Sequence, residues 1–292
     1  TGTIDANVVV SDAMRSAWTG TLVTITVTNT GDSAVIGSGS LRAAILESNA
    51  SGAVDDIIQF SIGSGPQTIT PGSALPSITD KVTIDGTTQP GYLGTPLIRI
   101  DGISAGAGVD GLVLSGAGSS DSTIKALMIT RFTASGIGLD ASNNDVITAN
   151  YIGTDGAAAL GNTSWGVNLL NGASGNLIGG VTAGTGNVMA FMGFDSVRLQ
   201  ATAGSGNAIL GNSMHDNTQD GIDLDPNGTN PNDLNDVDTG PNDLQNYPVL
   251  AFAAADVSTI VVSGTLNSEA NKTYRIEFFA NTTNDNEGER YL

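Results

Sequence analysis

Oxygen-bearing side chains concentrate between residues 223 and 243, at short intervals. The residues concerned are Asp223, Asp225, Asn227, Asp233, Asp236, Asp238 and Asp243, with Asn232, Asn235 and Asn242 among them. Calcium takes six to eight oxygen ligands from groups of this kind. The spacing differs from that of an EF-hand loop, and an acidic, solvated turn explains the same residues. We treat them as a hypothetical calcium site, one that would hold two parts of the chain together rather than catalyse a reaction.

His215 is the single histidine, and it precedes Asp216, a pair that could act as a general base. No serine between the glycines of a nucleophile elbow accompanies it, and one histidine rarely makes a metal site. The sequence therefore favours a histidine at a turn. Trp18 and Trp165 fit either sugar stacking or packing at the edge of a core, and both interpretations stay open.

The overall charge limits the classes of partner. With 29 acidic and 10 basic residues the chain carries a formal charge of −19, which disfavours nucleic acid and anionic membranes as partners. The chain has no cysteine, so disulfides and cysteine chemistry are excluded. No apolar stretch approaches the ~20 residues of a membrane span, and we expect no membrane insertion. Thr1 to Asn7 lack the features of a signal peptide, so export would require a leader that was removed or lies outside this sequence.

The composition and the repeats favour stacked β-strands over a globule. Glycine accounts for 39 residues and aromatic residues for only 5% of the chain. Copies of a Gly-x-x-Leu pattern, 25 or 30 residues apart, begin at Gly111, Gly136, Gly166, Ser196 (a degenerate copy) and Gly221. Apolar residues alternate within each copy, so one face of each strand should point inward. Copies stacked in parallel would form columns of small aliphatic side chains.

Asparagine recurs in two further series. One has Asn144, Asn176 and Asn207 ahead of apolar pairs, and the other has Asn162, Asn187 and Asn212 after glycine, each 25 residues apart. Asparagine tolerates the left-handed backbone of a sharp turn, and its amide can form hydrogen bonds along a stack. The interleaved series therefore predict a repeating unit of several short strands with a turn between each.

The two ends of the chain differ from the repeats. Near the N-terminus a strand at 22–27 precedes a short helix at 40–48, with Ser40 as its N-cap and an apolar face that should cover the first repeat. Further short strands are expected at 56–60, 67–70, 81–84 and 97–100. After about Tyr247, longer alternating strands at 257–266 and 273–279 look like the start of a β-sandwich, with too few strands to complete one. Ile4–Val10 is a further apolar, strand-like segment.

Several motifs resemble a family of bacterial cell-surface β-helix domains marked by Ser-Leu-Arg-(Glu/Gln)-Ala-Ile. The matching stretches are 26–33, Gly39-Ser40-Leu41-Arg42-Ala43-Ala44-Ile45, 75–91, 150–155, 223–225 and 245–248. Ala43 stands where the family usually has Glu or Gln. The resemblance implies an all-β fold: a right-handed parallel β-helix, or solenoid, with a short N-terminal capping helix, followed by a partial, immunoglobulin-like C-terminal β-sandwich. We expect an N-terminal strand segment at 1–20, the capped β-helix at 21–246 and the partial sandwich at 247–292.

The resemblance implies a structural or adhesive module at the cell surface or outside the cell, without catalysis. Its expected partners are other copies of the chain, neighbouring domains of a larger surface protein, or an extracellular polysaccharide. Ile4–Val10 of one copy could complete the sandwich of the next and build a head-to-tail filament.

The alternative is a polysaccharide-active enzyme (lyase, hydrolase or epimerase) or a glycan-binding module, since related folds also support such roles. A lyase needs a basic residue beside an acidic sugar, and the repeats offer only Lys125, Arg131 and Arg198. A glycoside hydrolase needs paired carboxylates. Asp55 and Asp56 are adjacent and should face opposite sides, and we expect Asp140, Asp155 and Asp195 to stand alone at turns.

Overall fold

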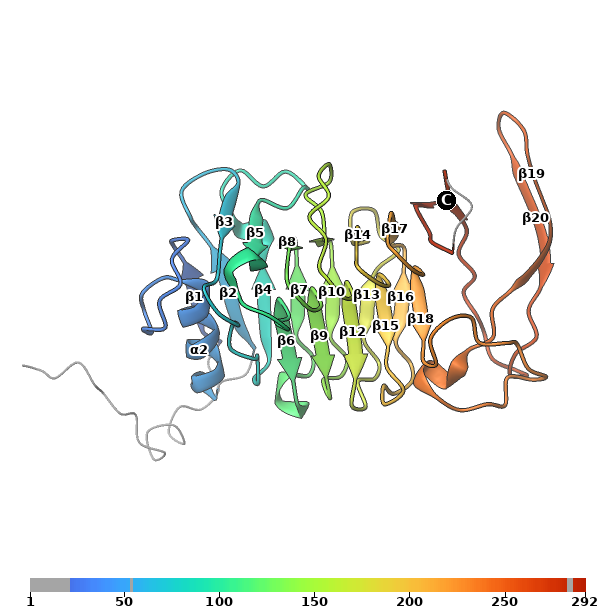
Figure 1. Ribbon diagram of the computed structural model, residues 1–292, viewed down its shortest axis with the longest axis horizontal. Helices are drawn as coiled ribbons and strands as arrows, with labels where there is room; N and C mark the ends of the chain where they lie inside the picture. Colours follow the sequence, from blue (N-terminus) through green and yellow to red (C-terminus); the bar gives the residue numbers. More distant parts are fainter. Residues whose placement is uncertain (1–21, 53–54, 283–285) are drawn as a thin grey trace, which may run out of the picture.

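The computed structural model describes residues 22–52, 55–282 and 286–292 of the 292-residue chain. These residues are mostly β structure, with three parallel sheets of seven, six and five strands and few helices. The sheets extend along the long axis of the molecule (Figure 1). The segment 1–20, including the predicted strand Ile4–Val10, lies outside the described residues.

Within each sheet, strands that lie side by side are not consecutive in the chain. The first sheet contains β1 (Thr24–Val27), β2 (Asp56–Phe60), β4 (Val82–Asp85), β7 (Thr123–Lys125), β10 (Val146–Thr148), β13 (Leu177–Gly179) and β16 (Ala208–Leu210). The second contains β17 (Ser213–His215), β14 (Val188–Ala190), β11 (Tyr151–Ile152), β8 (Leu127–Thr130), β5 (Ile98–Asp101) and β3 (Gln67–Ile69). The third contains β18 (Ile222–Leu224), β15 (Val197–Leu199), β12 (Val167–Leu170), β9 (Ile137–Asp140) and β6 (Leu112–Ser115). Together β1 to β18 form what we call the stack.

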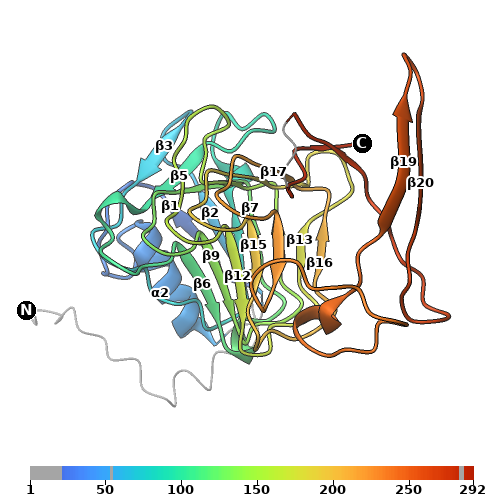
Figure 2. The same ribbon diagram turned by 45° about the vertical axis from the view of Figure 1, so that its right-hand side comes forward.

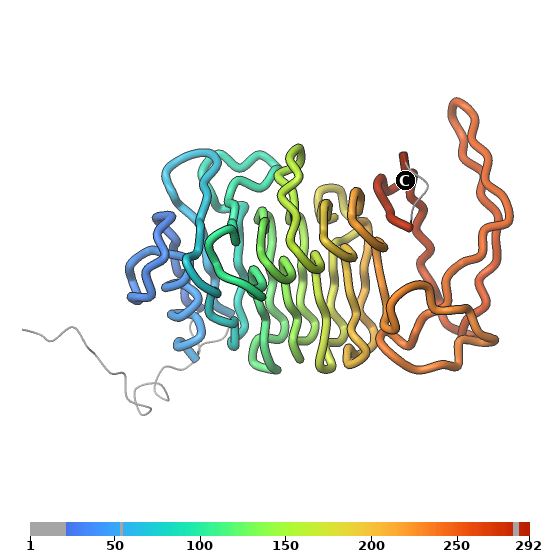
Figure 3. Tube along the Cα trace, viewed as in Figure 1, coloured from blue at the N-terminus to red at the C-terminus, as the bar shows by residue number. Residues whose placement is uncertain are grey.

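Successive strands of the chain enter the three sheets in turn. From β4 onward the chain places one strand in the first sheet, one in the second and one in the third before it returns to the first. We call each such set of three strands a layer, and the last layer is β16, β17 and β18. This order, which can be followed along the tube in Figure 3, is consistent with a parallel β-solenoid.

The Gly-x-x-Leu repeat accounts for the whole third sheet. Its five copies form β6, β9, β12, β15 and β18, which pair in parallel. Val167 lies between Ile137 and Val197 in this register, and Ile222 follows Val197. The prediction that the copies stack in parallel, with Ile and Val in one column, is confirmed.

The core consists of aliphatic columns that run from layer to layer. In the third sheet Leu114, Leu139, Leu169 and Leu199 follow one another and are all buried. In the first sheet the buried column is Ile58, Ile84, Ile124, Ile147 and Ile178. Such burial stabilises the stack by roughly 25 cal/mol for each Å² of apolar surface removed from water.

Asparagine side chains, most of them buried, connect the layers at two corners. Before the first sheet, the Oδ1 atoms of Asn176, Asn207 and Asn242 each accept a hydrogen bond from the backbone N–H one layer earlier, at 2.8, 3.1 and 2.8 Å. Before the second sheet, Asn187 and Asn212 do the same at 2.9 and 3.0 Å. Asn162, which the sequence placed in one series with these two, stands at another corner and accepts from Phe132 N. Its equal spacing of 25 residues is therefore no sign of an equivalent place in the stack.

The predicted capping helix is present as α2 (Leu41–Ser51) and packs against β1 and β2. Ser40 is its N-cap, and the Ser40 hydroxyl accepts a hydrogen bond from Ala43 N at 3.1 Å. Leu41, Ala44 and Ile45 are buried. Figure 1 shows α2 at one end of the stack. The described residues also contain four short 3₁₀ turns: η1 (Gly86–Thr88), η2 (Gly102–Ser104), η3 (Ala117–Ser119) and η4 (Pro241–Leu244).

The C-terminal region forms two antiparallel ribbons. β19 (Val249–Ala255) pairs with β20 (Ile260–Thr265), and β21 (Phe279–Ala280) pairs with β22 (Arg290–Tyr291). The strand predicted at 257–266 thus begins at Ile260, because 256–259 form the hairpin turn, closed by Asp256 N donating to Thr259 O. The strand predicted at 273–279 is largely wrong, since only its last residue lies in a strand. Instead this segment runs to the end of the stack, where Gly211 N donates to the Glu277 carboxylate at 2.8 Å.

Within the described residues, no helix combines the length and the apolar character needed to cross a bilayer. The one α-helix described, α2, has 11 residues.

Candidate functional site

The seven residues of the predicted calcium site separate into three places. Asp223, Asp225 and Asn227 gather around the guanidinium of Arg198, which forms ion pairs with both carboxylates and donates to Asn227 Oδ1 at 3.0 Å. Three of the expected cation ligands therefore already contact a positively charged group.

The stack itself brings Arg198 to these oxygens. Arg198 lies in β15 and pairs in register with Asp223 in β18. Asp225 follows that strand and also accepts a hydrogen bond from Ala201 N at 2.7 Å. Sequence reasoning missed the role of Arg198, although its separation of 25 residues from Asp223 equals that of the last two Gly-x-x-Leu copies. The repeat period was therefore a usable signal.

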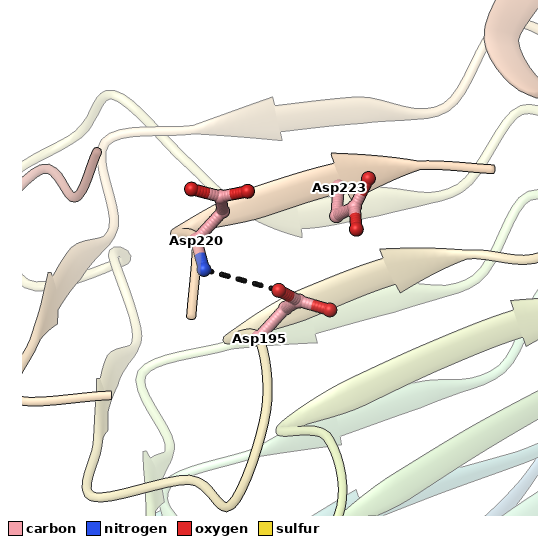
Figure 4. Close-up of side chains that lie close together, drawn as sticks. All are labelled: Asp195, Asp220 and Asp223. Atoms are coloured by element: carbon pink, nitrogen blue, oxygen red, sulfur yellow. Dashed lines mark hydrogen bonds between the residues drawn. The ribbon is translucent and has the colours of Figure 1, made fainter. Parts of the chain in front are cut away.

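Asp195 belongs to the same region, which corrects the expectation that it stands alone at a turn. One carboxylate oxygen each from Asp195, Asp220 and Asp223 lie within 4.8 Å of one another. Asp195 is again 25 residues before its partner, since its Oδ1 accepts from Asp220 N at 3.0 Å. Figure 4 shows this bond and the three carboxylates at adjacent strands.

Burial changes the acidity of this group. Asp195 is 0% exposed and Asp223 is 3% exposed. Burial raises the pKa of the Asp195 carboxyl above its usual value, and the charge of Asp223 raises it further. Burial likewise raises the pKa of Asp223, against the opposing effects of the Gly228 N–H and Arg198. These two carboxyls therefore hold their protons to a higher pH than exposed aspartates do.

A second carboxylate group is formed by Asp233, Asp236 and Asp238. The two oxygens of Asp236 accept hydrogen bonds from Asn246 N, from Gln245 Nε2 and from the Ser268 hydroxyl. Asp236 thus ties the acidic segment to the residues that follow it. Desolvation raises the pKa of Asp238, with the charges of Asp233 and Asp236 adding to this effect.

Asp243 lies apart from both groups. Its Oδ1 accepts a hydrogen bond from the Ser205 hydroxyl at 2.6 Å. The neighbouring Asn242 extends one asparagine column beyond the last layer through its bond to Asn207 N. This end of the predicted site therefore serves to fasten η4 to the stack.

A cavity of about 980 Å³ lies between the last layer and the C-terminal segment. Its apolar lining includes Ile222, Tyr247 and Tyr274, and its polar lining includes Asp220 and Asp223. Asp220 and Asp223 thus border a space large enough for water and small ligands.

His215 and Trp165 belong to neither carboxylate group. His215 Nδ1 is 2.8 Å from Asp216 Oδ2, and the ring meets Phe191 edge-on at 6.0 Å between centroids. Trp165 packs against Phe194 at 5.8 Å. Both rings are half-buried, which fits packing on the side of the stack. Trp18 lies outside the described residues.

The comparisons with known proteins assign no role to these residues. No family model matches the chain, and no curated protein matches it either. The function is therefore inferred from the sequence and the geometry alone.

Proposed function

We propose that the chain is a non-catalytic structural or adhesive module that acts outside the cell, with copies joined head to tail. In this proposal the three sheets close into a right-handed parallel β-helix, and the strands after residue 247 form part of an immunoglobulin-like sandwich. A strand from a second copy completes that part.

The observation that carries the proposal is the exposed hairpin β19–β20. Val249, Leu250, Phe252, Ile260 and Val261 are each more than half exposed. Among the described residues β19 pairs only with β20, so each strand keeps one unpaired edge. A long, apolar strand with an open edge is a template for pairing with another chain.

The positions of the two ends support a head-to-tail arrangement. α2 lies at one end of the stack and the hairpin projects at the other, as Figures 1 and 2 show. When two copies join through different surfaces, each copy keeps one surface free for a further copy. Such a contact builds a filament unless the rotation between copies closes a ring. The proposed occupant of the open edge is Ile4–Val10 of the next copy, whose alternating apolar sequence suits strand addition.

The test is the association state of the full chain over a wide concentration range, by analytical ultracentrifugation and electron microscopy. We expect concentration-dependent linear assemblies that Val261→Lys in the hairpin and Val9→Pro in the N-terminal segment both weaken. Leu93→Lys is the matched control, because Leu93 is 96% exposed but lies away from the hairpin. A monomer at all concentrations, or assembly insensitive to both variants, would rule the proposal out.

A second candidate, glycan binding, is favoured by the cavity at the end of the stack. Tyr247 and Tyr274 line it together with the amide side chains of Asn230, Gln245 and Asn246. Aromatic faces and amides are groups that commonly recognise sugars. Binding on a panel of neutral and acidic glycans, lost in Tyr274→Ala, would support this function. If no glycan on the panel binds, this second candidate function is wrong.

A further inference from the structure

The carboxylates of Asp195, Asp220 and Asp223 meet because the last two layers stack in register. Asp195 comes two residues before β15, Asp220 comes two residues before β18, and Asp223 lies within β18. The two strands pair in parallel, with Val197 opposite Ile222. Backbone contacts hold the start of both strands together, since Ser196 N donates to Asp220 O at 3.1 Å. The group is thus positioned by the sheet.

Two oxygens of this group have no hydrogen-bond partner among the described residues, although their side chains are almost fully buried. They are Asp195 Oδ2 and Asp223 Oδ1. The nearest positive group to Asp195 Oδ2 is Arg198 Nη1, at 3.6 Å, which is too long for a hydrogen bond. Figure 4 shows both carboxylates turned toward the space between the two strands. A buried carboxylate oxygen without a partner is costly, so each points to a missing ligand.

Other oxygens of the group already accept hydrogen bonds. Asp223 Oδ2 accepts from Gly228 N at 3.2 Å and contacts Arg198, and Asp220 Oδ1 accepts from Asn286 Nδ2 at 2.8 Å. Arg198 itself is shared with Asp225. Arg198 pairs with three carboxylates, those of Asp195, Asp223 and Asp225, and Asp220 adds a fourth beside two of them. One guanidinium therefore faces more carboxylates than it can neutralise.

We propose that Asp195, Asp220 and Asp223 bind one calcium ion, each through one carboxylate oxygen. Oxygens that lie within 4.8 Å of one another can surround a single ion, since this limit is about twice a calcium–oxygen distance. Magnesium requires shorter bonds in a stricter octahedron, and three carboxylates held by a sheet suit it less well. Water from the adjoining cavity, which Asp220 and Asp223 line, supplies the other ligands.

This ion would cross-link the open end of the stack. It joins Asp195 of one layer to Asp220 and Asp223 of the next, and through Asn286 it reaches the C-terminal segment. Of the residues that the sequence predicted as calcium ligands, only Asp223 belongs to this site. The ion binds within a single copy, so its site is independent of the proposed filament.

The test is calcium titration of the full chain by isothermal titration calorimetry after chelation of divalent ions, with thermal melting as a second readout. We expect one site, a higher melting temperature with calcium, and magnesium affinity at least about ten-fold weaker. Asp195→Asn and Asp220→Asn should each weaken calcium binding at least about ten-fold. Both variants keep an oxygen for the existing hydrogen bonds, and Asp220 is only half-buried, so Asp220→Asn gives a result even if Asp195→Asn fails to fold.

The matched control is Asp238→Asn in the second carboxylate group, which should bind calcium as the parent chain does. Absence of calcium binding by the parent chain would overturn the inference, as would normal binding in a folded Asp220→Asn variant. Loss of binding in Asp238→Asn alone would place the ion at Asp233, Asp236 and Asp238, and so would also overturn it. Equal affinity for magnesium would contradict the choice of calcium.

Discussion

Side chains buried at the corners form hydrogen bonds with the backbone of neighbouring layers. Small changes in their chemistry should therefore change the stability of the fold. Asp145 lies in the same column as Asn176 and Asn207, one layer before Asn176. Its Oδ1 accepts from Ser122 N at 2.9 Å, whereas its Oδ2 has no hydrogen-bond partner among the described residues. In the same column, Asn176 donates its amide N–H to Ser142 O and Asn207 donates to Ala173 O. Asp145 lacks that donor.

We predict that Asp145→Asn stabilises the protein at neutral pH. Burial raises the pKa of Asp145 to about 6, so the folded state holds its proton more tightly than the unfolded state does. The free energy of unfolding should therefore fall as the pH rises from about 4 to about 6, by about 1–3 kcal/mol from this group. Asparagine at this position has no carboxyl to ionise, so the pH-dependent loss of stability disappears. Its side chain also supplies the N–H donor that Asn176 and Asn207 have. Urea unfolding of both proteins across this pH range measures the difference.

The reciprocal control is Asn176→Asp, which places a second carboxylate in the column. It should lose stability at neutral pH and recover part of it in acid. If the parent chain and Asp145→Asn show parallel pH profiles, the carboxyl of Asp145 is not a buried acid with a raised pKa.

Arg198 allows a second prediction at this scale. Arg198→Gln leaves Asp195 and Asp223 buried without their cation, which should reduce the free energy of unfolding by about 3–5 kcal/mol in a chelating buffer at neutral pH. Urea unfolding provides the measurement. Lys272→Gln, which breaks an ion pair on the surface, is the control and should have no measurable effect. Equal stability of the two variants would show that Arg198 does not balance the buried carboxylates.

The strands of the stack are so short that their packing depends on close approach between layers. Two glycines near the start of β9 have different surroundings: Gly136 directly precedes the strand, and Gly138 lies within it. A Cβ atom on Gly136 would lie 2.6 Å from Ile152 Cγ2 and 2.8 Å from Gly166 O. A Cβ on Gly138 would make only ordinary contacts, at 3.6 Å from Val113 and 3.9 Å from Asp110 Oδ2. In this copy the first position therefore requires glycine, and the third does not.

We predict that Gly136→Ala and Gly138→Ala differ in the sign of their effect. The first should destabilise the protein by about 1–3 kcal/mol because the added methyl group is forced into a packed core. The second should be neutral or stabilising by up to about 1 kcal/mol, because alanine restricts the unfolded chain more than glycine does. Thermal and urea unfolding report both values. Equal losses would mean that the layers are spaced differently from the structure.

At the scale of the whole molecule, the stack is closed at one end by α2 and continued at the other by a less regular segment. β17 is covered by residues 286–289, through Met214 N donating to Gly288 O at 2.8 Å and Ser213 donating to Glu289 O at 2.6 Å. Ile222 in β18 remains 44% exposed. The end layer of the stack is therefore only partly capped within one copy.

We predict that the hairpin contributes almost nothing to the stability of the stack. Replacing 250–264 by a short Gly/Ser linker should change the melting temperature by no more than about 2 °C, because the removed side chains are exposed and Val249 already pairs with Thr265. Differential scanning calorimetry gives the value. A drop of many degrees would show that the hairpin packs against the stack. The same variant should also lose self-association.

The sequence by itself determined the parts of this protein that depend on local pattern. The Gly-x-x-Leu copies predicted one strand per layer and their order, since alternation and a repeat of 25 or 30 residues are properties of the chain alone. Ser40 with Leu41, Ala44 and Ile45 predicted the capping helix for the same reason.

Only the tertiary structure decided which residues occupy equivalent places in successive layers, because the loops between the strands differ in length from one layer to the next. Asn150 and Asn187 are 37 residues apart yet adjacent in one column, while Asn162 and Asn187, 25 residues apart, are not. Asp195 joined Asp220 and Asp223 through the register of β15 and β18. The 25-residue period could have paired Asp195 with Asp220, but only the structure shows how close the three carboxylates lie. The segment 273–278 alternates like a strand but has no strand beside it, since pairing requires a partner that only the fold can provide.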